Sequence, residues 1–298
     1  MASGIEVLGV ITRTDAEVGR KRVLTPSAVA KVANELGLRI HKTNQIDPET
    51  LEWCRKLNAD LGVVVAYGAI FKPEMLDVPR RGWINLHYSL LPRWRGAAPV
   101  QHSILAGDRE TGVTAFQLDA GMDTGPIWSQ AHTVIEPHES AGSLLVRLTQ
   151  LGISCLLEAM PKVLAGIEQP LVQSNEGATS ASKPTRDLAR VHFDRDAANV
   201  ENLIRAMNPE PMSWALWRDE PIQLLEAVSL GSTDWANLGT ATDHTVPGSV
   251  VLVNERVMVQ TGAGTLIEVK QVKPAGKQAM DARDWCRGFN RESDWLLR

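Results

Sequence analysis

Strand-like and helix-like patterns alternate along the chain as far as Leu164, and this alternation restricts the fold more than any other feature of the sequence. The runs Ile5–Thr12 and Ala59–Tyr67 are short, apolar and β-branched, as is typical of buried strands. The predicted strands are Ile5–Thr12, Leu38–His41, Ala59–Tyr67, Trp83–His87, Gly112–Leu118 and Ile127–Ile135. The predicted helices are Thr25–Gly37, Pro48–Asn58, Ala97–Ala106 and Ser140–Leu164. Such alternation favours βαβ units and predicts an α/β fold with a Rossmann-like, mostly parallel sheet.

The pattern changes after a stretch rich in Ser, Thr, Asn, Gly and Pro, QSNEGATSASKP, which is typical of a linker. One helix, Ala197–Met207, is then followed by short β-like segments separated by turns. These segments are Met212–Trp217, Pro221–Ser229, Gly248–Leu252, Arg256–Gln260 and Thr265–Val272. They predict a small OB-like β-barrel, although a sandwich fits the same pattern. We therefore expect a catalytic domain over residues 1–177, a linker over 178–198 and a second domain over 199–298.

Composition and charge narrow the class of protein. The 298 residues are 44% hydrophobic and 22% charged, which is ordinary for a globular protein. The net charge of −4 means that any nucleic-acid binding must depend on a local basic patch. The three cysteines form no Cys-x-x-Cys motif, and no leader pattern or apolar run of about 18 residues is present. We expect a cytoplasmic monomer that makes no contact with membranes.

Two polar residues end the predicted strand Trp83–His87. Asn85 and His87 are two positions apart, so on a strand they point to the same face. They also lie at the carboxyl end of the strand, where parallel sheets bind ligands. An amide and an imidazole side by side can donate two hydrogen bonds to one developing oxyanion. From spacing alone, the alternative is that both side chains only cap loop carbonyls.

Two acids, Asp119 and Asp123, follow the predicted strand Gly112–Leu118, in the stretch LDAGMDTGP (Leu118–Pro126). Acids flanked by glycine are common in turns for structural reasons. In a parallel sheet, however, a carboxylate at this position can orient or polarise His87, or accept a proton through water. The set contains no Ser or Cys nucleophile, so it suits direct attack by a substrate amine on an activated acyl group.

Further motifs accompany these residues. They are Asn85-Leu86-His87, SLLPRWRGAAPVQ (Ser89–Gln101), Asp123-Thr124-Gly125-Pro126, GRKRVLTPS (Gly19–Ser27), NPEPMSW (Asn208–Trp214) and KPAGKQAM (Lys273–Met280). Together they resemble the 10-formyltetrahydrofolate-dependent formyltransferases, most closely the branch that formylates methionyl-tRNA. The resemblance runs from about Ser3 to Met280.

The resemblance implies roles for individual residues. Asn85 and His87 would stabilise the oxyanion, and Asp123 would set the state of His87 and help to move the proton lost by the amine. Residues that would border or approach the folate are Ser89, Leu90, Leu91, Pro92, Ala66, Tyr67 and Gly68. The co-substrate would be 10-formyltetrahydrofolate, with no metal, and the sequence contains no motif such as His-Glu-x-x-His.

Local basic groups imply the second substrate, methionyl initiator tRNA. Arg20, Lys21 and Arg22 lie in the polar loop Arg13–Val23, which follows a strand on the side of the predicted site. Lys270, Lys273 and Lys277 form another group in the second domain. Both groups can contact phosphates, with Arg20 expected to matter most, and the alternative is that they are solvated surface charges.

Two other functions fit the sequence. One is formyl transfer to another amine, such as a sugar nucleotide or glycinamide ribonucleotide, although a small amine would need neither the basic loop nor the second domain. The other is an inactive, truncated chain that retains tRNA binding.

The chain departs from the family at its start. Family members begin with a strand, a turn containing Gly-Thr-Pro and a helix that have no counterpart before Ile5–Thr12. That strand lies at the centre of the family's sheet. Without it, the two neighbouring strands would have unpaired edges, and the core would have an unfilled space. Either the coding sequence starts upstream of Met1, which we favour, or the protein is truncated and impaired.

Overall fold

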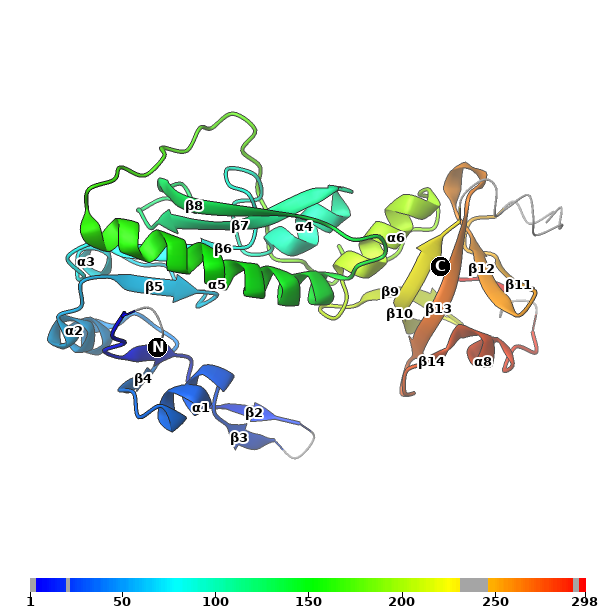
Figure 1. Cartoon of the computed structure of the whole chain (residues 1–298). Coiled ribbons are helices and arrows are strands. Elements are labelled where there is room, and N and C mark those ends of the chain that lie inside the picture. The colour runs from blue at the N-terminus through cyan, green and yellow to red at the C-terminus, as the bar shows by residue number, and fades with distance from the viewer. Residues whose placement is uncertain (1–3, 20–21, 231–245, 292–294) are drawn as a thin grey trace. The chain divides into compact units, whose positions relative to one another are not determined.

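The computed structural model describes residues 4–19, 22–230, 246–291 and 295–298 (Figure 1). Contacts divide the chain into two units, each described by itself below. The first comprises residues 1–97, 112–132 and 149–180, and the second residues 98–111, 133–148 and 181–298. Three elements contain residues of both units: β7 (Glu110–Gln117), β8 (Ile127–Val134) and α5 (Ala141–Ala165).

The main strands of the first unit lie in two separate sheets. β1 (Val10–Thr12) pairs in parallel with β4 (Ile40–Lys42). The second sheet has the order β5-β6-β7-β8, in which β5 (Gly62–Val65) is parallel and β7 antiparallel to β6 (Trp83–His87). Within the described residues, β1 and β5 each pair on one side only. This confirms the expectation of unpaired edges.

β5 is buried on one face only. Val64 packs with Ile11 against the cluster around Cys54, Met75 and Trp83, whereas Val63 and Val65 are 41% and 44% exposed. The prediction that this apolar run is covered on both faces is therefore wrong. Successive side chains of a strand point to opposite faces, and the face of Val63 and Val65 stays exposed.

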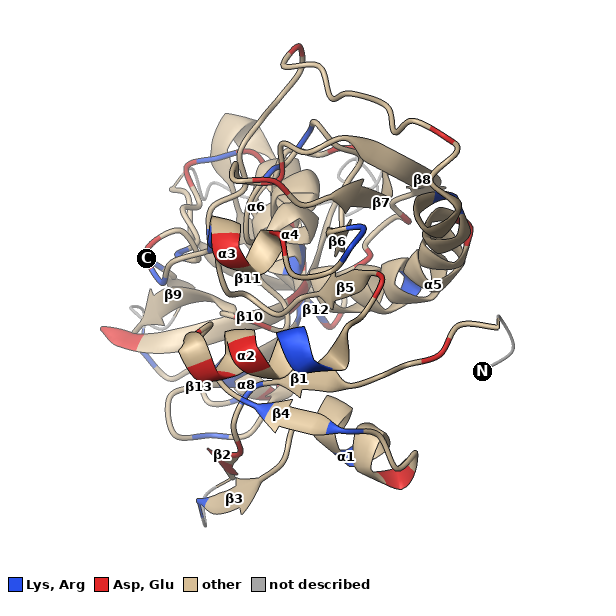
Figure 2. Ribbon diagram, turned by 90° about the vertical axis from the view of Figure 1, so that its left-hand side faces the viewer, with Lys and Arg blue, Asp and Glu red and all other residues tan. Residues whose placement is uncertain are grey.

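The helices of the first unit begin at the predicted signals. Ser27 caps α1 (Ala28–Glu35) by accepting a hydrogen bond from the backbone N–H of Ala30 at 2.9 Å. Asp47 caps α2 (Pro48–Leu57) in the same way. Acidic and basic residues of α2 are coloured in Figure 2. Glu49 lies in the first turn of this helix, and Arg55 and Lys56 lie in the last turn. This arrangement complements the helix dipole. The short helix α3 (Pro73–Leu76) also belongs to the first unit, whereas α4 (Pro99–Leu105) belongs to the second.

α5 has two different apolar stripes. Leu144, Leu148, Cys155 and Ala159 share one side and are buried, and the absence of a side chain at Gly152 lets the helix approach Leu86 of β6. The opposite side exposes Val146, Ile153 and Leu157. By length and composition alone α5 is long and apolar enough to cross a membrane, which is weak support because core helices meet the same criterion. The buried stripe and the contact with Leu86 are typical of a helix that covers a sheet.

The second unit is built on an antiparallel sheet with the order β11-β12-β13-β10-β9, and β14 pairs with β13. Its strands are β9 (Ser213–Trp217), β10 (Glu220–Ser229), β11 (Val250–Val253), β12 (Arg256–Gln260), β13 (Leu266–Pro274) and β14 (Met280–Asp281). Apolar residues of α6 (Ala197–Ala206) and α8 (Ala282–Cys286) pack with the sheet in one core. The fold is therefore α/β, with a Rossmann-like part and a small barrel-like part, as predicted.

Candidate active site

β6 places Asn85 and His87 on the same face of the sheet, as the spacing predicts. Its register sets Asn85 beside Val64 of β5 and His87 beside Thr114 of β7. The His87 side chain is 6% exposed, whereas Asn85 is half-buried. Among the described residues, the Asn85 carboxamide has no hydrogen-bond partner. Its N–H groups are therefore available to an oxygen atom of a ligand.

A backbone carbonyl fixes the tautomer of His87. Nε2 of His87 lies 2.8 Å from the carbonyl oxygen of Trp94. Because a carbonyl oxygen only accepts hydrogen bonds, Nε2 carries the proton, and in the neutral ring Nδ1 keeps its lone pair. Burial lowers the pKa of His87, while the negative charge of Asp123 and the bond to Trp94 oppose this effect. The ring is therefore neutral at pH 7 and able to accept a proton at Nδ1.

Asp123 faces that lone pair. Its Oδ2 lies 3.7 Å from Nδ1 of His87 and accepts a hydrogen bond from the backbone N–H of Gly96 at 2.7 Å. The 3.7 Å separation exceeds a hydrogen bond, as it should for a carboxylate opposite a lone pair. A proton arriving at Nδ1 would turn this contact into an ion pair. In the neutral state, His87 gives its only N–H to Trp94, so in the described part of the chain Asn85 is the member of the predicted pair whose side-chain N–H groups remain available.

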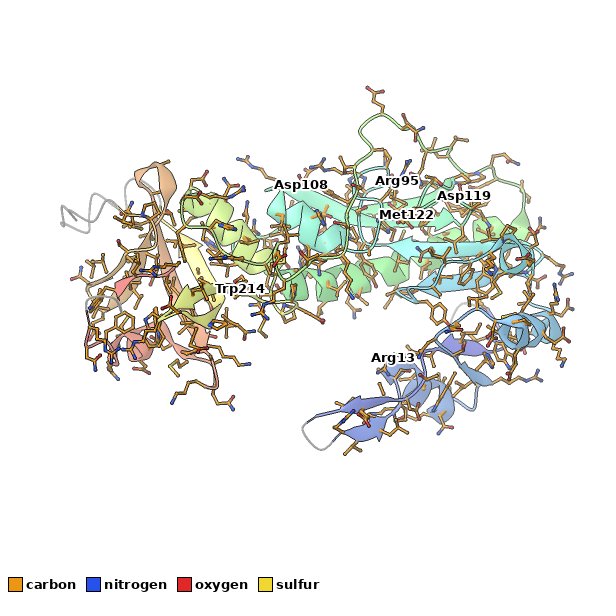
Figure 3. All side chains as sticks on the ribbon, turned by 180° about the vertical axis from the view of Figure 1, so that it is seen from behind. Arg13, Arg95, Asp108, Asp119, Met122 and Trp214 are labelled. Atoms are coloured by element: carbon orange, nitrogen blue, oxygen red, sulfur yellow. The ribbon has the colours of Figure 1, made fainter. Side chains whose placement is uncertain are left out.

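Asp119, the other acid of the turn that contains Asp123, has different hydrogen-bond partners. Oδ1 of Asp119 accepts hydrogen bonds from the Gly121 N–H at 2.9 Å and from the Thr124 hydroxyl at 2.8 Å. Figure 3 labels Asp119 and Met122 on this turn, close to Arg95 of the neighbouring loop. Asp119 therefore stabilises the turn, and Asp123 is the acid that faces His87.

The predicted folate-border residues Ser89–Pro92 continue directly from His87. Ser89 and Leu91 are buried, at 1% and 4% exposure, whereas Leu90 and Pro92 are half-buried. The Ser89 hydroxyl donates to the carbonyl of Arg93 at 2.6 Å, and the Thr114 hydroxyl donates to the carbonyl of Ser89 at 2.7 Å. These bonds hold the loop in one shape, with Leu90 and Pro92 as its more accessible members.

The predicted pterin-side residues follow β5, so they lie at the same sheet edge as the end of β6. Ala66 and Gly68 are exposed and have positive φ angles of 49° and 79°. The Tyr67 hydroxyl donates to the carbonyl of Thr43 at 3.1 Å. The backbone at Ala66 and Gly68 is thus accessible while the side chain of Tyr67 is tied down.

The predicted basic loop contains a hairpin. β2 (Ala16–Val18) pairs antiparallel with β3 (Val23–Thr25), so the prediction of an irregular loop over the whole of Arg13–Val23 is wrong. Local pairing of the two short strands accounts for the difference. Arg20 and Lys21 lie outside the described residues, and the Arg22 guanidinium forms an ion pair with Glu17 at 2.5 Å.

The lysines of the second unit lie on one strand and the turn after it. A register shift of β13 falls at Lys270, so the alternation of side chains is interrupted there, and Lys270 and Lys273 each flank a buried valine and lie on the side of the strand away from the core. Lys270 also lies 3.7 Å from Glu268, and Lys277 occupies the turn after the strand. The described part of the chain contains no group of three His, Cys, Asp or Glu residues suited to a metal ion.

Several contacts of the site have no sequence signal. The Trp94 carbonyl and the Gly96 N–H act through the backbone, which any residue type supplies. Gln173, which contacts the Asp123 turn, falls in a stretch whose composition predicts a linker. The sequence gives one indication of a special backbone shape there, the Pro-Arg-Trp-Arg-Gly stretch that begins five residues after His87.

Sequence comparisons match nearly the whole chain. The family model described as "Formyl transferase" matches residues 2–160, and the one described as "Formyl transferase, C-terminal domain" matches residues 183–290. "Methionyl-tRNA formyltransferase" of Leifsonia xyli subsp. xyli is 42% identical, covering 98% of this chain and 93% of its own length. The protein of that name from Acidothermus cellulolyticus is 43% identical, with coverages of 97% and 91%.

Structural comparisons show the same fold. WlaRD, a sugar 3N-formyl transferase, superimposes with a TM-score of 0.63 at 16% identity, covering 91% of this chain and 88% of its own. HypX from Aquifex aeolicus in complex with tetrahydrofolic acid gives a TM-score of 0.63 at 18% identity, with coverages of 85% and 43%. Together with the family models and the relatives, these findings establish that the chain belongs to the formyl transferase family.

Proposed function

We propose that this protein transfers the formyl group of 10-formyltetrahydrofolate to the amino group of methionine on initiator tRNA. The observation that carries the chemistry is the buried His87, whose Nδ1 faces Asp123 at 3.7 Å, beside the amide of Asn85, which has no hydrogen-bond partner among the described residues. The choice of acceptor is supported by relatives named methionyl-tRNA formyltransferase that are 42% and 43% identical over almost the whole chain.

The first chemical step needs a proton acceptor and an oxyanion donor. The neutral amine attacks the formyl carbon, a C–N bond forms, and the carbonyl electron pair moves to oxygen. Asn85 donates a hydrogen bond to that oxygen. Nδ1 of His87 takes the proton from the attacking nitrogen, and the resulting imidazolium is stabilised by Asp123.

The second step returns the proton. The oxygen electron pair re-forms the carbonyl, the bond to N10 of the folate breaks, and His87 gives its proton to N10. His87 is then neutral again, so one residue acts as base and then as acid. No covalent enzyme intermediate is needed, because the amine itself is the nucleophile, and the predicted catalytic residues Asn85, His87 and Asp123 include no Ser or Cys.

The remaining roles follow the site's layout. Leu90, Pro92 and the accessible backbone at Ala66 and Gly68 would border the folate. Residues 1–177 would carry catalysis and residues 199–298 would bind tRNA, joined by 178–198. We further propose that the protein acts as a monomer in the cytoplasm.

The test is a comparison of formyl acceptors. The full chain is incubated with 10-formyltetrahydrofolate and either methionyl initiator tRNA or an amino-sugar nucleotide, and the formylated product is counted. We expect formylation of the tRNA only. Formylation of the sugar alone would replace the proposal with transfer to a sugar amine. Binding of tRNA with no transfer to either acceptor would support the inactive-chain alternative.

Arg20→Ala is expected to weaken tRNA binding without affecting the folate. Loss of one phosphate contact should reduce the slope of log affinity against log salt by about 1. The measurement is tRNA binding over a salt series, with the KM for 10-formyltetrahydrofolate measured in parallel. Lys31→Ala, which removes an exposed cation from α1, is the control. An unchanged salt slope for Arg20→Ala would remove this residue from the tRNA site.

A further inference from the structure

The carboxamide of Gln173 joins the two loops that hold His87 and Asp123. Its Nε2 donates to the backbone carbonyls of Asp123 at 3.0 Å and Gly125 at 2.6 Å. Its Oε1 accepts from Nε and Nη2 of Arg95 at 3.2 and 2.9 Å. All four hydrogen-bonding positions of the amide are therefore used. A flipped amide would set N–H groups against a guanidinium and an oxygen against two carbonyls, so these partners fix its orientation.

Both loops contain a residue with a strained backbone. Trp94 and Asp123 have φ angles of 63° and 54°, in the left-handed region that non-glycine residues rarely adopt. Such residues persist only where their surroundings hold them in place. Gly125 contributes to this packing, because a Cβ there would lie 1.8 Å from the carbonyl oxygen of Gln117. The turn is thus pressed against β7 and has little freedom to relax.

A second residue of the same segment holds the Trp94 loop. The Thr179 hydroxyl accepts a hydrogen bond from the backbone N–H of Trp94 at 2.9 Å, and its carbonyl accepts from the N–H of Arg95 at 2.9 Å. The Trp94 carbonyl is the group that fixes the proton on Nε2 of His87. The segment from Gln173 to Thr179 therefore contacts both loops that orient the site.

We propose that Gln173 is a positioning residue, which sets the separation between the Asp123 carboxylate and His87 by tying the Asp123 turn to Arg95. This inference rests on the proposed roles of His87 and Asp123. Gln173 need not touch either substrate. It acts by keeping the carboxylate where it stabilises the proton that His87 receives.

Gln173→Leu removes all four hydrogen bonds while keeping a side chain of similar size. We expect kcat to fall about tenfold, because small displacements of catalytic groups have effects of this order. The KM values for tRNA and folate should change less than about threefold. Asn175→Ala is the matched control: its Oδ1 accepts from Nη1 of the same Arg95 at 3.2 Å, but within the described ranges its side chain makes no hydrogen bond to the Asp123 turn. It should leave kcat within about twofold.

The decisive measurement needs no substrate. The protonation of His87 is followed against pH by NMR of the ¹⁵N-labelled imidazole in the full chain. In the described part of the chain, Asp123 is the charged group that acts on His87, while the Arg95 guanidinium is engaged by Gln173, Asn175 and the Ser174 carbonyl. If Gln173→Leu lets the carboxylate move away, the pKa of His87 falls.

A double-mutant cycle separates positioning from general damage. If Gln173 acts through Asp123, Gln173→Leu lowers the pKa of His87 in the original chain and has no effect in the Asp123→Asn background. An equal shift in both backgrounds, or no shift in either, would overturn the inference. Gln173→Met gives the same test if Gln173→Leu loses the native circular dichroism spectrum. Because the NMR result does not depend on the formyl acceptor, failure of the proposed function would be seen separately in the transfer assay.

Discussion

His87→Gln is expected to lower kcat by about 10²- to 10⁴-fold, the range lost when a general acid–base group is removed. Glutamine can place an N–H where Nε2 of His87 donates to the Trp94 carbonyl, so the bond of 2.8 Å has a substitute. It has no basic nitrogen where Nδ1 faces Asp123. The variant therefore removes proton transfer while keeping much of the site's shape.

Steady-state kinetics with methionyl initiator tRNA and 10-formyltetrahydrofolate measure the effect. KM for both substrates should stay within about threefold, because a base that acts in the transition state contributes little to substrate binding. His132→Gln, at an exposed position of β8, controls for the substitution itself and should have near-original activity. A decrease of less than tenfold in kcat for His87→Gln would show that His87 is not the proton acceptor.

The parts of the site that were predicted correctly depend on strand geometry. The predicted strand Trp83–His87 coincides with β6, and the period of two places Asn85 and His87 on one face whatever the rest of the fold does. Leu86 between them is 4% exposed and packs in the core, which fixes which face points inward. Side-chain alternation is local, so sequence alone was enough.

The parts that were not predicted depend on contacts between distant segments. The neutral tautomer of His87 follows from a carbonyl oxygen seven residues away, and every residue has such an oxygen. Gln173 reaches the Asp123 turn from a position 50 residues further along the chain. Composition marks its stretch as polar and irregular, but it does not show which backbone groups that stretch will meet.

The exposed apolar surfaces also show the limit of a local pattern. The run that forms β5 is apolar throughout, which predicts a strand buried on both faces. Burial, however, depends on what covers the strand, and Val65 remains 44% exposed. Val146 of α5 is 66% exposed in the same way. The hydrophobic pattern thus predicted the strand and the helix correctly, but it did not predict which segments would cover them.

Asp123→Asn is expected to lower the plateau of kcat/KM by about 10²-fold or more, because the imidazolium formed during transfer loses its counter-charge. Asparagine keeps an oxygen that can accept the 2.7 Å hydrogen bond from Gly96, so the loop contact is retained. The substitution therefore removes the charge with little change in packing.

The pH dependence of kcat/KM gives a second, independent test of the role of Asp123. Only neutral His87 can accept the amine proton, so kcat/KM rises with pH through the pKa of His87 and then levels off. Burial holds that pKa below its ordinary value and the Asp123 charge opposes the effect. Removing the charge lets the pKa fall further, so the acidic limb of the profile moves to lower pH.

The combination of a lower plateau and an acidic limb at lower pH distinguishes electrostatic support of His87 from structural damage to the turn. Asp119→Asn is the control, because Asp119 bonds Thr124 and Gly121 in the same turn and does not face His87. It should leave the acidic limb in place even if loosening of the turn reduces the rate. An acidic limb that stays fixed, or moves to higher pH, in Asp123→Asn would mean that Asp123 does not act through His87. The fall in rate would then reflect the lost position of the turn rather than the lost charge.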